Sequence, residues 1–507
     1  MNPLSRMLTL HPQDNVAVAL ADISVGETDN IAGVKALQAV KQGHKIAVKP
    51  IAAGQNVLRY GQTIGQATAD IAAGEHVHVQ NLGMGEHTSD YAHATEAKLL
   101  LASPDVRTFN GYHRADRSVG TRNYLGILTS VNCSGSVAKF IAEAAEKSGL
   151  MDDFPNIDGI VPITHGTGCG MSGENEGYDT LFRTLSGYAQ HPNFGGILLI
   201  GLGCEVMQVS ALVAGRPIRA DGALRYMTIQ QEGGTRMTIE KGLAELRSIA
   251  EIANNATRQP APVSELMVGM QCGGSDGYSG ITANPALGVA SDLVVRHGGT
   301  TILSETSEIY GAEHLLTRRA ATVEVGEKLI DRVRWWEDYT ARNKGKMDNN
   351  PSPGNKRGGL TTILEKSLGA VAKSGSAPLT AVYLFAEKID KKGFVFMDSP
   401  GFDPCSVTGQ IASGANLIVF TTGRGSVSGY MPTPCIKIAT NSEMYARMSD
   451  DMDINCGDIV SDGVSLEEKG SEIFEMFIRI ASGEQTKSED LGFGGVEFVP
   501  WQIGAVM

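Results

Sequence analysis

From Tyr124 onward, short apolar runs alternate with segments of helical periodicity, and this alternation constrains the fold more than any other feature of the chain. Such alternation is typical of α/β units built around a mostly parallel sheet. The first expected strands are Tyr124 to Leu128, Gly159 to Ile163 and Gly196 to Ile200, and a long amphipathic helix is expected from Gly233 to Ala256. We therefore predict a middle α/β domain over residues 106–258.

The alternation resumes after a Gln-Pro-Ala-Pro stretch at 259–262, which indicates a domain boundary. The expected strands are Leu266 to Met270, Thr300 to Leu303, Thr380 to Phe385, Phe394 to Met397, Asn416 to Phe420 and Cys435 to Ile438, and the expected helices are Pro285 to Arg296, Val323 to Arg342 and Leu466 to Ile480. This pattern predicts a Rossmann-like domain with a parallel sheet over 259–507. Because no GxGxxG fingerprint opens it, no nucleotide cofactor is expected.

The N-terminal segment repeats one small element three times, as Asp22-Ile23-x-x-Gly26-Glu27, Pro50-Ile51-x-x-Gly54-Gln55 and Asp70-Ile71-x-x-Gly74-Glu75. Short runs with β-branched residues at period two lie near these elements, which favours strand, turn and strand. We predict a small all-β domain over 1–82. Residues 83–105 have no sustained periodicity and are expected to form a linker.

Charge and apolar content exclude several classes of protein. The formal net charge is -13 and no segment carries a cluster of lysine or arginine, so nucleic acid is not an expected partner. No apolar run approaches the roughly 20 residues that cross a bilayer, and the N-terminus lacks a signal-peptide pattern, so we expect a cytoplasmic protein. In that reducing compartment, an odd number of cysteines, seven, suggests free thiols or metal ligands before disulfides.

Four cysteines, Cys133, Cys169, Cys204 and Cys272, each follow a strand-like run. In open α/β sheets, ligands bind outside the carboxyl ends of the strands. Glycine flanks three of the four cysteines, and Glu205 follows Cys204, so thiolates and a carboxylate suited to a transition metal lie where a site is expected. The alternative is that each cysteine is a small buried apolar residue.

Histidines in the N-terminal domain offer a second set of ligands: His11, His44, His76 and His78. Residues two apart in a strand point to the same face, so His76 and His78 could present two imidazoles to one ligand. The alternative is a pair that faces solvent.

Two loops carry donors suited to a polyhydroxy acid. The stretch at 350–359, which reads Asn-Pro-Ser-Pro-Gly-Asn-Lys-Arg-Gly-Gly, is not expected to be a helix interior and offers Asn355 and Lys356. The stretch at 421–425 places Arg424 just after an expected strand. Amide and cationic donors bind carboxylates and hydroxyls well. Capped surface turns are the alternative reading of both loops.

Taken together, these motifs resemble those of the altronate and galactarate dehydratases, and they extend over nearly the whole chain. The matching segments include His11-Pro-Gln-Asp14, Gly43-His44-Lys45, Arg59-Tyr60-Gly61, Gly74-Glu75-His76-Val-His78, Gly120-Thr-Arg122-Asn123, Gly168-Cys169, Gly201-Leu-Gly-Cys204-Glu205, Cys272-Gly-Gly-Ser275-Asp276, Asn284-Pro285, Asn350-Pro-Ser-Pro-Gly-Asn355-Lys356, Thr422-Gly-Arg424-Gly425 and Asp453-Ile-Asn455.

The resemblance implies a β-clip domain of the SAF type, a linker, a second domain that makes contacts in a homodimer, and a Rossmann-like C-terminal domain. It also implies a hydro-lyase that dehydrates a sugar acid with Fe²⁺ or another divalent cation in its place. The residues expected in catalysis are His11, His44, His76, His78, Lys356 and Arg424; in substrate binding, Arg122, Asn123, Asn355, Ser275, Asp276 and Asn284; and in metal binding, His11, His76, His78, Cys169, Cys204, Glu205 and Cys272.

Among the substrates of this family, we expect altronate as the first choice and galactarate as the alternative. The segment at 74–78 resembles altronate dehydratases, whereas the turns at 130–133 and 270–272 are closer to galactarate dehydratases. Two other classes stay open: a sugar-acid binding protein without catalysis, and an iron-sulfur enzyme that uses Cys169, Cys204 and Cys272 as cluster ligands.

Overall fold

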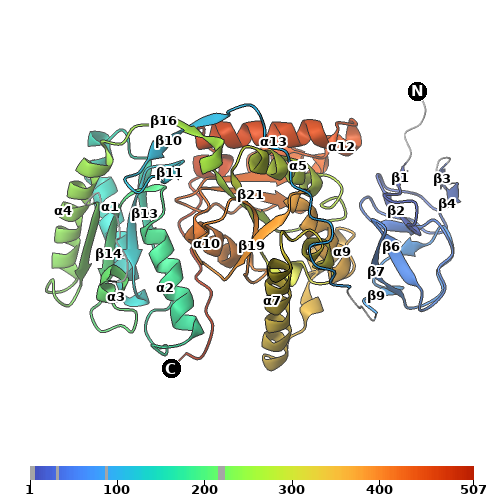
Figure 1. Cartoon of the computed structure of the whole chain (residues 1–507), viewed down its shortest axis with the longest axis horizontal. Coiled ribbons are helices and arrows are strands. Elements are labelled where there is room, and N and C mark those ends of the chain that lie inside the picture. The colour runs from blue at the N-terminus through green and yellow to red at the C-terminus, as the bar shows by residue number, and fades with distance from the viewer. Residues whose placement is uncertain (1–5, 30–32, 86–89, 215–222, 507) are drawn as a thin grey trace.

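The computed structural model describes residues 6–29, 33–85, 90–214 and 223–506. Figure 1 shows three parts in a row: the small β domain (blue) at one end, an α/β domain (green) at the other, and the C-terminal α/β domain between them. The predicted fold class is confirmed. No helix in the described part of the chain has the length and apolar content that crossing a membrane requires.

The N-terminal domain consists of short antiparallel strands. One sheet has the order β1-β2-β5-β8, a second has β6-β7-β9, and β3 pairs with β4. The bounds are β1 Met7–Leu8, β2 Val16–Ala19, β3 Thr28–Asp29, β4 Val34–Lys35, β5 Lys45–Ala47, β6 Asn56–Arg59, β7 Gln62–Ala67, β8 His76–Val77 and β9 Leu82–Gly83. The isoleucines of the repeated element, Ile23, Ile51 and Ile71, are buried, so each packs its turn against the domain core.

The middle domain has a parallel four-stranded sheet in the order β13-β12-β14-β15. Its elements are β12 Tyr124–Thr129, α1 Gly135–Lys147, β13 Gly159–Ile163, α2 Glu176–Ala189, β14 Phe194–Gly201, α3 Val209–Ala214, β15 Leu224–Thr228 and α4 Thr235–Ala253. Leu198 and Ile200 of β14 pack with α1 and α4, whereas Ile197 and Leu199 pack with α2. The sheet is therefore covered on both faces, which explains its continuous apolar strands.

The C-terminal domain has a parallel seven-stranded sheet in the order β19-β20-β18-β17-β21-β22-β23. Its strands are β17 Met267–Cys272, β18 Thr300–Leu303, β19 Leu379–Tyr383, β20 Gly393–Met397, β21 Leu417–Thr422, β22 Cys435–Ala439 and β23 Ile454–Asn455. Its helices are α5 Ala283–Arg296, α6 His314–Thr317, α7 Val323–Arg342, α8 Pro353–Arg357, α9 Ile363–Val371, α10 Asp403–Ser413, α11 Ser442–Arg447, α12 Asp458–Ser461, α13 Leu466–Ala481 and α14 Lys487–Asp490. Helices α5 and α13 cover one face and α10 the other.

The stretch at 259–262, where a domain boundary was expected, forms β16 Gln259–Pro262 beside β10 Thr108–His113, in a sheet with β11 Val119–Gly120. The expectation for the second irregular segment was wrong. The stretch at 350–359 contains the one-turn helix α8. Its proline occupies the first turn, where no backbone N–H is needed, and Ser352 and Asn355 form a reciprocal capping box.

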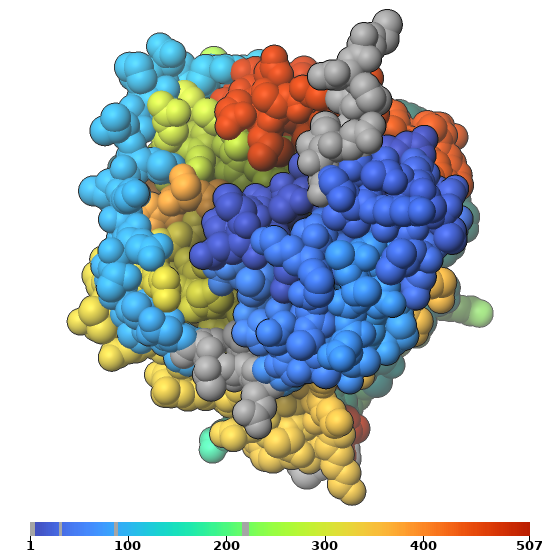
Figure 2. Space-filling view, turned by 90° about the vertical axis from the view of Figure 1, so that its right-hand side faces the viewer, coloured from blue at the N-terminus to red at the C-terminus, as the bar shows by residue number. Residues whose placement is uncertain are grey.

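The described part of the segment between the first two domains lies along the C-terminal domain. The backbone N–H of Ala94 donates to the carbonyl of Thr317 at 2.9 Å, and that of Ser103 donates to the carbonyl of Arg296 at 2.8 Å. Figure 2 shows this segment in light blue over the yellow part of the surface, next to the darker blue N-terminal domain. The segment therefore follows the surface of its neighbour.

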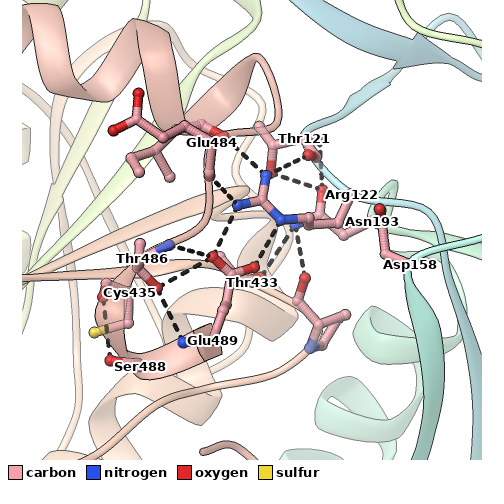
Figure 3. Close-up of polar contacts among 12 residues, drawn as sticks. Thr121, Arg122, Asp158, Asn193, Thr433, Cys435, Glu484, Thr486, Ser488 and Glu489 are labelled. Carbon is pink, nitrogen blue, oxygen red and sulfur yellow. Dashed lines mark hydrogen bonds and ion pairs between the residues drawn. The ribbon is translucent and has the colours of Figure 1, made fainter. Parts of the chain in front are cut away.

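Arg122 joins the middle domain to the end of the C-terminal domain, as Figure 3 shows. Its guanidinium is buried and binds both carboxylate oxygens of Glu489 at 2.7 and 2.8 Å. It also donates to the carbonyls of Ile480 and Glu484 at 2.8 Å each. Because these contacts occupy the guanidinium, the structure places Arg122 in a domain junction and not in a substrate site.

A second buried ionic junction holds the N-terminal domain on the C-terminal domain. Glu365 of α9 accepts from Lys45 of β5 at 2.9 Å and from Arg59 of β6 at 2.5 Å, and all three side chains are buried. Lys45 also donates to the carbonyl of Gly359, and Arg59 donates to the carbonyl of Gly277, at 2.7 Å each. Burial opposes ionisation of Glu365, but the two cations lower its pKa to about 2. We call these three side chains the docking cluster.

Replacing Arg122 by Met should lower the free energy of unfolding by about 3–5 kcal/mol, because Glu489 would remain buried without its cation. The matched control is Arg107→Met. The ion pair of Arg107 and Glu475 also connects the start of β10 to α13. Its side chains are 36% and 48% exposed, so the loss of unfolding free energy should stay below about 1 kcal/mol. Chemical denaturation measures both values. Equal losses would contradict the role assigned to Arg122.

Glu365→Gln should release the N-terminal domain, because two buried cations would lose the carboxylate that they share. Limited proteolysis should then cut the segment at 90–105 faster than in the native protein. A group with a depressed pKa stabilises above its unfolded value and loses that contribution as the pH falls through its folded value. The stability difference between Glu365→Gln and the native protein should therefore shrink as the pH falls from 4.5 toward 2. A difference independent of pH in this range would contradict an ionised Glu365.

Candidate active site

The crevice of the seven-stranded sheet lies where the strand order changes direction. β17 has β18 on one side and β21 on the other, and in such sheets ligands bind at this switch point, outside the carboxyl ends of the strands. The turns after β17 and β21 meet there, because the backbone N–H groups of Gly423 and Arg424 donate to the carbonyl of Gly274 at 3.1 and 2.8 Å. A Cβ on Gly423 would lie 2.1 Å from the carboxyl carbon of Asp276, so only glycine fits.

Asp276 fastens the turns of this crevice together. Its buried carboxylate accepts from Thr440 and Asn441, which follow β22, at 3.0 Å each, and from the backbone N–H of Ser279 at 3.0 Å. Burial raises the pKa of Asp276 above its usual value, although these hydrogen bonds oppose the shift. Asp276 was predicted to bind substrate, but within the protein its carboxylate already has several donors.

The loop at 350–359 brings the N-terminal domain to the crevice. Asn355 donates to the carbonyl of Ser275 at 2.8 Å, which ties α8 to the turn after β17. The carbonyl oxygens of Lys356 and Arg357 receive hydrogen bonds from His78 and His44, at 2.9 and 3.2 Å. Two predicted motifs far apart in sequence therefore meet at one place.

His44, His76 and His78 form a cluster that faces this loop. The ring centres are 5.1 Å apart for His44 and His76, 5.0 Å for His44 and His78, and 5.4 Å for His76 and His78. The rings of His76 and His78 stack at 16°, as their two-residue spacing predicted. Nδ1 of His44 and Nε2 of His76 are 3.0 Å apart. We call these residues the histidine cluster.

The histidine cluster fits a divalent transition metal. Two ring nitrogens 3.0 Å apart match neighbouring ligands of one ion at roughly 2.1 Å from each. The hydrogen bonds from Nε2 of His44 and of His78 to backbone carbonyls place the proton on that nitrogen and leave Nδ1 as a lone-pair donor. Burial lowers the pKa of all three histidines, to about 4 for His76 and His78, so the rings are uncharged near neutral pH.

His11 lies apart from the histidine cluster. It is exposed, its Nδ1 accepts from the backbone N–H of Gln13 at 3.2 Å, and a Cβ on Gly61 would lie 2.8 Å from that nitrogen. Within the described part of the chain it makes no ring contact with the other three histidines. The geometry therefore separates His11 from the ligands it was predicted to join.

The predicted metal ligands do not gather at one place. Cys169, Cys204 and Glu205 follow strands of the middle domain, and Figure 1 shows the whole C-terminal domain between them and the N-terminal domain. Cys272 is buried at the end of β17. A single metal site that uses both the histidines and the cysteines of the middle domain is therefore wrong.

Two other side chains that were predicted to bind substrate donate hydrogen bonds to backbone carbonyls instead. Asn123 donates to the carbonyls of Asn156 and Ala253 at 2.7 and 3.1 Å. Asn284 donates to the carbonyl of Gly369 at 2.8 Å and accepts from Thr421 at 2.6 Å. Like Arg122, both side chains are buried and engaged within the protein.

A buried ionic cluster behind the crevice was missed by the sequence analysis. Lys373 donates to Sγ of Cys272 at 2.9 Å, and Lys366 donates to Glu308 at 2.6 Å. Potential ligand atoms of Cys272, Glu305 and Glu308 lie within 4.8 Å of one another, which no other group of three achieves in the described part of the chain. Glu305 and Glu308 follow β18, so the strand-end rule applied to the cysteines would have found them.

Protonation and backbone geometry set this buried cluster apart from an ordinary core. Burial raises the pKa of Cys272 to about 12, and burial together with Glu308 raises the pKa of Glu305 and brings that of Asp403 to about 6. Glu305 has φ = 71°, a left-handed conformation that strains a residue with a side chain, and its Oε1 has no hydrogen-bond partner among the described residues. Such strain often occurs at functional sites.

Three family models together match most of the chain. They are described as Altronate/galactarate dehydratase SAF domain (residues 5–85), D-galactarate dehydratase/Altronate hydrolase, second domain (111–254), and D-galactarate/Altronate dehydratase, C-terminal (263–506).

Relatives of full length agree with these models. An altronate dehydratase of Bacillus subtilis is 35% identical and covers 97% of this chain and 98% of its own. A galactarate dehydratase (L-threo-forming) of Escherichia coli is 38% identical over 96% and 95%, and an altronate dehydratase of Escherichia coli is 37% identical over 95% and 96%. The chain therefore belongs to the altronate and galactarate dehydratase family.

Proposed function

We propose that this chain is a hydro-lyase that removes water from altronate and yields a 2-keto-3-deoxy acid. The observation that carries the proposal is the histidine cluster, a donor set suited to a divalent metal, held over the switch-point crevice in a member of a dehydratase family. Relatives named for altronate and for galactarate have similar identities, 35–37% and 38%. The choice of altronate rests on the segment at 74–78, which carries His76 and His78.

The proposed metal is Fe²⁺, held by Nδ1 of His44 and Nε2 of His76. When bound, the ion supplies Lewis-acid stabilisation of the negative charge that develops on the substrate carboxylate. The chain prepares the ligands in advance, because the carbonyl of Arg357 fixes the ring of His44 and β8 fixes that of His76.

Arg424 and Lys356 are proposed to hold the carboxylate and hydroxyl groups of the substrate. Arg424 is exposed at the carboxyl end of β21, and its side chain makes no hydrogen bond or ion pair within the described residues. Its guanidinium can therefore bind a carboxylate through two parallel hydrogen bonds. The half-exposed Lys356 follows Asn355, which ties this loop to the same crevice.

Dehydration requires loss of the proton on C2 and of the hydroxyl on C3. We propose that Nδ1 of His78 is the general base that removes the C2 proton. Nε2 of this ring donates to the carbonyl of Lys356, and Nδ1 has no hydrogen-bond partner in the described part of the chain. We assign protonation of the leaving hydroxyl to the ammonium of Lys356, which belongs to the same loop. The enol that results becomes the 2-keto product.

The cytosol is the compartment we propose, and a homodimer the assembly. A reducing compartment suits the seven cysteines, all of which are free thiols in the structure. The dimer rests on the resemblance of the second domain to that of the family.

Arg424→Ala should lower kcat/KM for the preferred acid by about 10²-fold, because a misplaced carboxylate leaves C2 out of line with the base. The assay is a panel of aldonic and aldaric acids with Fe²⁺ under anaerobic conditions, with 2-keto-3-deoxy products as readout. Arg334→Ala, on the exposed side of α7, is the matched control and should change nothing. Turnover of galactarate in preference to altronate would overturn the substrate, and binding without turnover of any acid would favour a sugar-acid binding protein.

His44→Ala and His76→Ala should each abolish most Fe²⁺ binding and most turnover, because each removes one of two adjacent ligand nitrogens. A chelator should abolish turnover by the native enzyme in the same way. His113→Ala, at the exposed last position of β10, serves as the control. Metal content of the purified variants, measured by elemental analysis, decides the point: native iron content in both cluster variants would contradict the assignment.

A further inference from the structure

Three of the seven cysteines are exposed, and they follow adjacent strands of one sheet. Cys133 comes after β12, Cys169 after β13 and Cys204 after β14, and the sheet order β13-β12-β14 makes these strands neighbours. Because parallel strands end at the same edge, the three thiols lie on one edge of the middle domain. The other four cysteines are buried.

The turns that carry the three thiols are bonded to one another. The backbone N–H of Asn132 donates to the carbonyl of Thr167 at 2.9 Å, and that of Met207 donates to the carbonyl of Gly168 at 3.0 Å. A hydrogen bond of 2.7 Å from Ser130 to the buried carboxylate of Glu205 joins the first turn to the third.

Close backbone approach between two of these turns requires glycine. Gly168 has φ = 98°, and a Cβ there would lie 2.2 Å from the carbonyl oxygen of Ser130. Residues with a side chain fit neither this conformation nor this space. The sequence around Cys169 is therefore built to bring its turn against that of Cys133.

Polar groups lie beside these turns. Cys133 lies just before α1, a helix of 13 residues. The side-chain amide of Gln230 donates to Sγ of Cys204 at 3.5 Å. A cavity of about 450 Å³ opens beside the first two turns, with Asn132, Thr164 and His165 in its wall.

The spacing of the thiols argues against a single ion. In the described part of the chain, none of the three belongs to a set of three ligand atoms within 4.8 Å of one another. An iron-sulfur cluster spreads its irons over several positions and binds thiolates that are farther apart than the ligands of one ion.

We propose that Cys133, Cys169 and Cys204 bind an iron-sulfur cluster. With three protein thiolates, one iron of a four-iron cluster has no cysteine and is open to an oxygen ligand such as water or a carboxylate. This site differs from the cluster considered from sequence, because Cys133 takes the place of the buried Cys272. It does not rest on the proposed function, since the histidine cluster belongs to the N-terminal domain, which lies at the opposite end of the molecule from the middle domain (Figure 1).

The test is anaerobic reconstitution of the full chain with ferrous iron, sulfide and a thiol. The native protein should bind iron together with acid-labile sulfide and show a broad visible absorption band. Cys133→Ser, Cys169→Ser and Cys204→Ser should each lose most of the sulfide and the band. The control Cys405→Ala changes a buried cysteine of α10 and should retain both.

Two outcomes would overturn the proposal: a native protein that binds iron without sulfide, or a triple serine variant that keeps native sulfide. Circular dichroism separates a lost ligand from a lost fold, and the exposed positions make serine a mild change. His44→Ala should keep the sulfide and the band, so loss of iron at the histidine cluster and loss of the sulfur cluster are measured independently.

Discussion

The docking cluster of Lys45, Arg59 and Glu365 is the contact on which the proposed active site depends. Lys45 follows His44 directly, so the ion pair that fixes β5 also fixes the first ring of the histidine cluster. On the other side, Lys366 follows Glu365 and reaches Glu308 behind the crevice. Glu365 and Lys366 of α9 therefore connect the N-terminal domain with the buried carboxylate of Glu308. A shift of α9 would move both sets of side chains at once.

Periodicity predicted most of the regular structure. Helix α7 has the predicted bounds, and the strands that were predicted in both parallel sheets agree within a few residues, because long apolar runs covered on both faces leave a clear pattern. The strands β15 and β23 were missed because β15 is mostly part-exposed without a strong apolar run, and β23 has only two residues. The pairing of β16 with β10 was also missed. A proline-rich stretch predicts a break in regular structure, and the strand that pairs with it lies far away in sequence.

The candidate site was harder to predict than the fold. Spacing predicted that His76 and His78 lie on the same face, since residues two apart in an extended segment point to the same side. It could not separate polar residues that face a ligand from those that hold loops, and so Arg122, Asn123 and Asn284 were assigned to substrate. Their partners come from segments hundreds of residues away or from backbone carbonyls, and neither leaves a trace in local sequence. The buried acids after β18 were missed for a simpler reason: the residues that follow the strand expected at Thr300 to Leu303 were not considered as ligands.

The segment that precedes the middle domain affects how strongly the docking cluster must bind. Backbone hydrogen bonds at Ala94, Glu96 and Ser103 pin this segment to the C-terminal domain, so the N-terminal domain is tethered close to its docking surface. A short tether raises the effective concentration of one partner at the other, and this favours the closed arrangement without any added contact. The N-terminal domain is thus held in place by its tether as well as by the docking cluster and by the apolar contacts that it shares with the C-terminal domain.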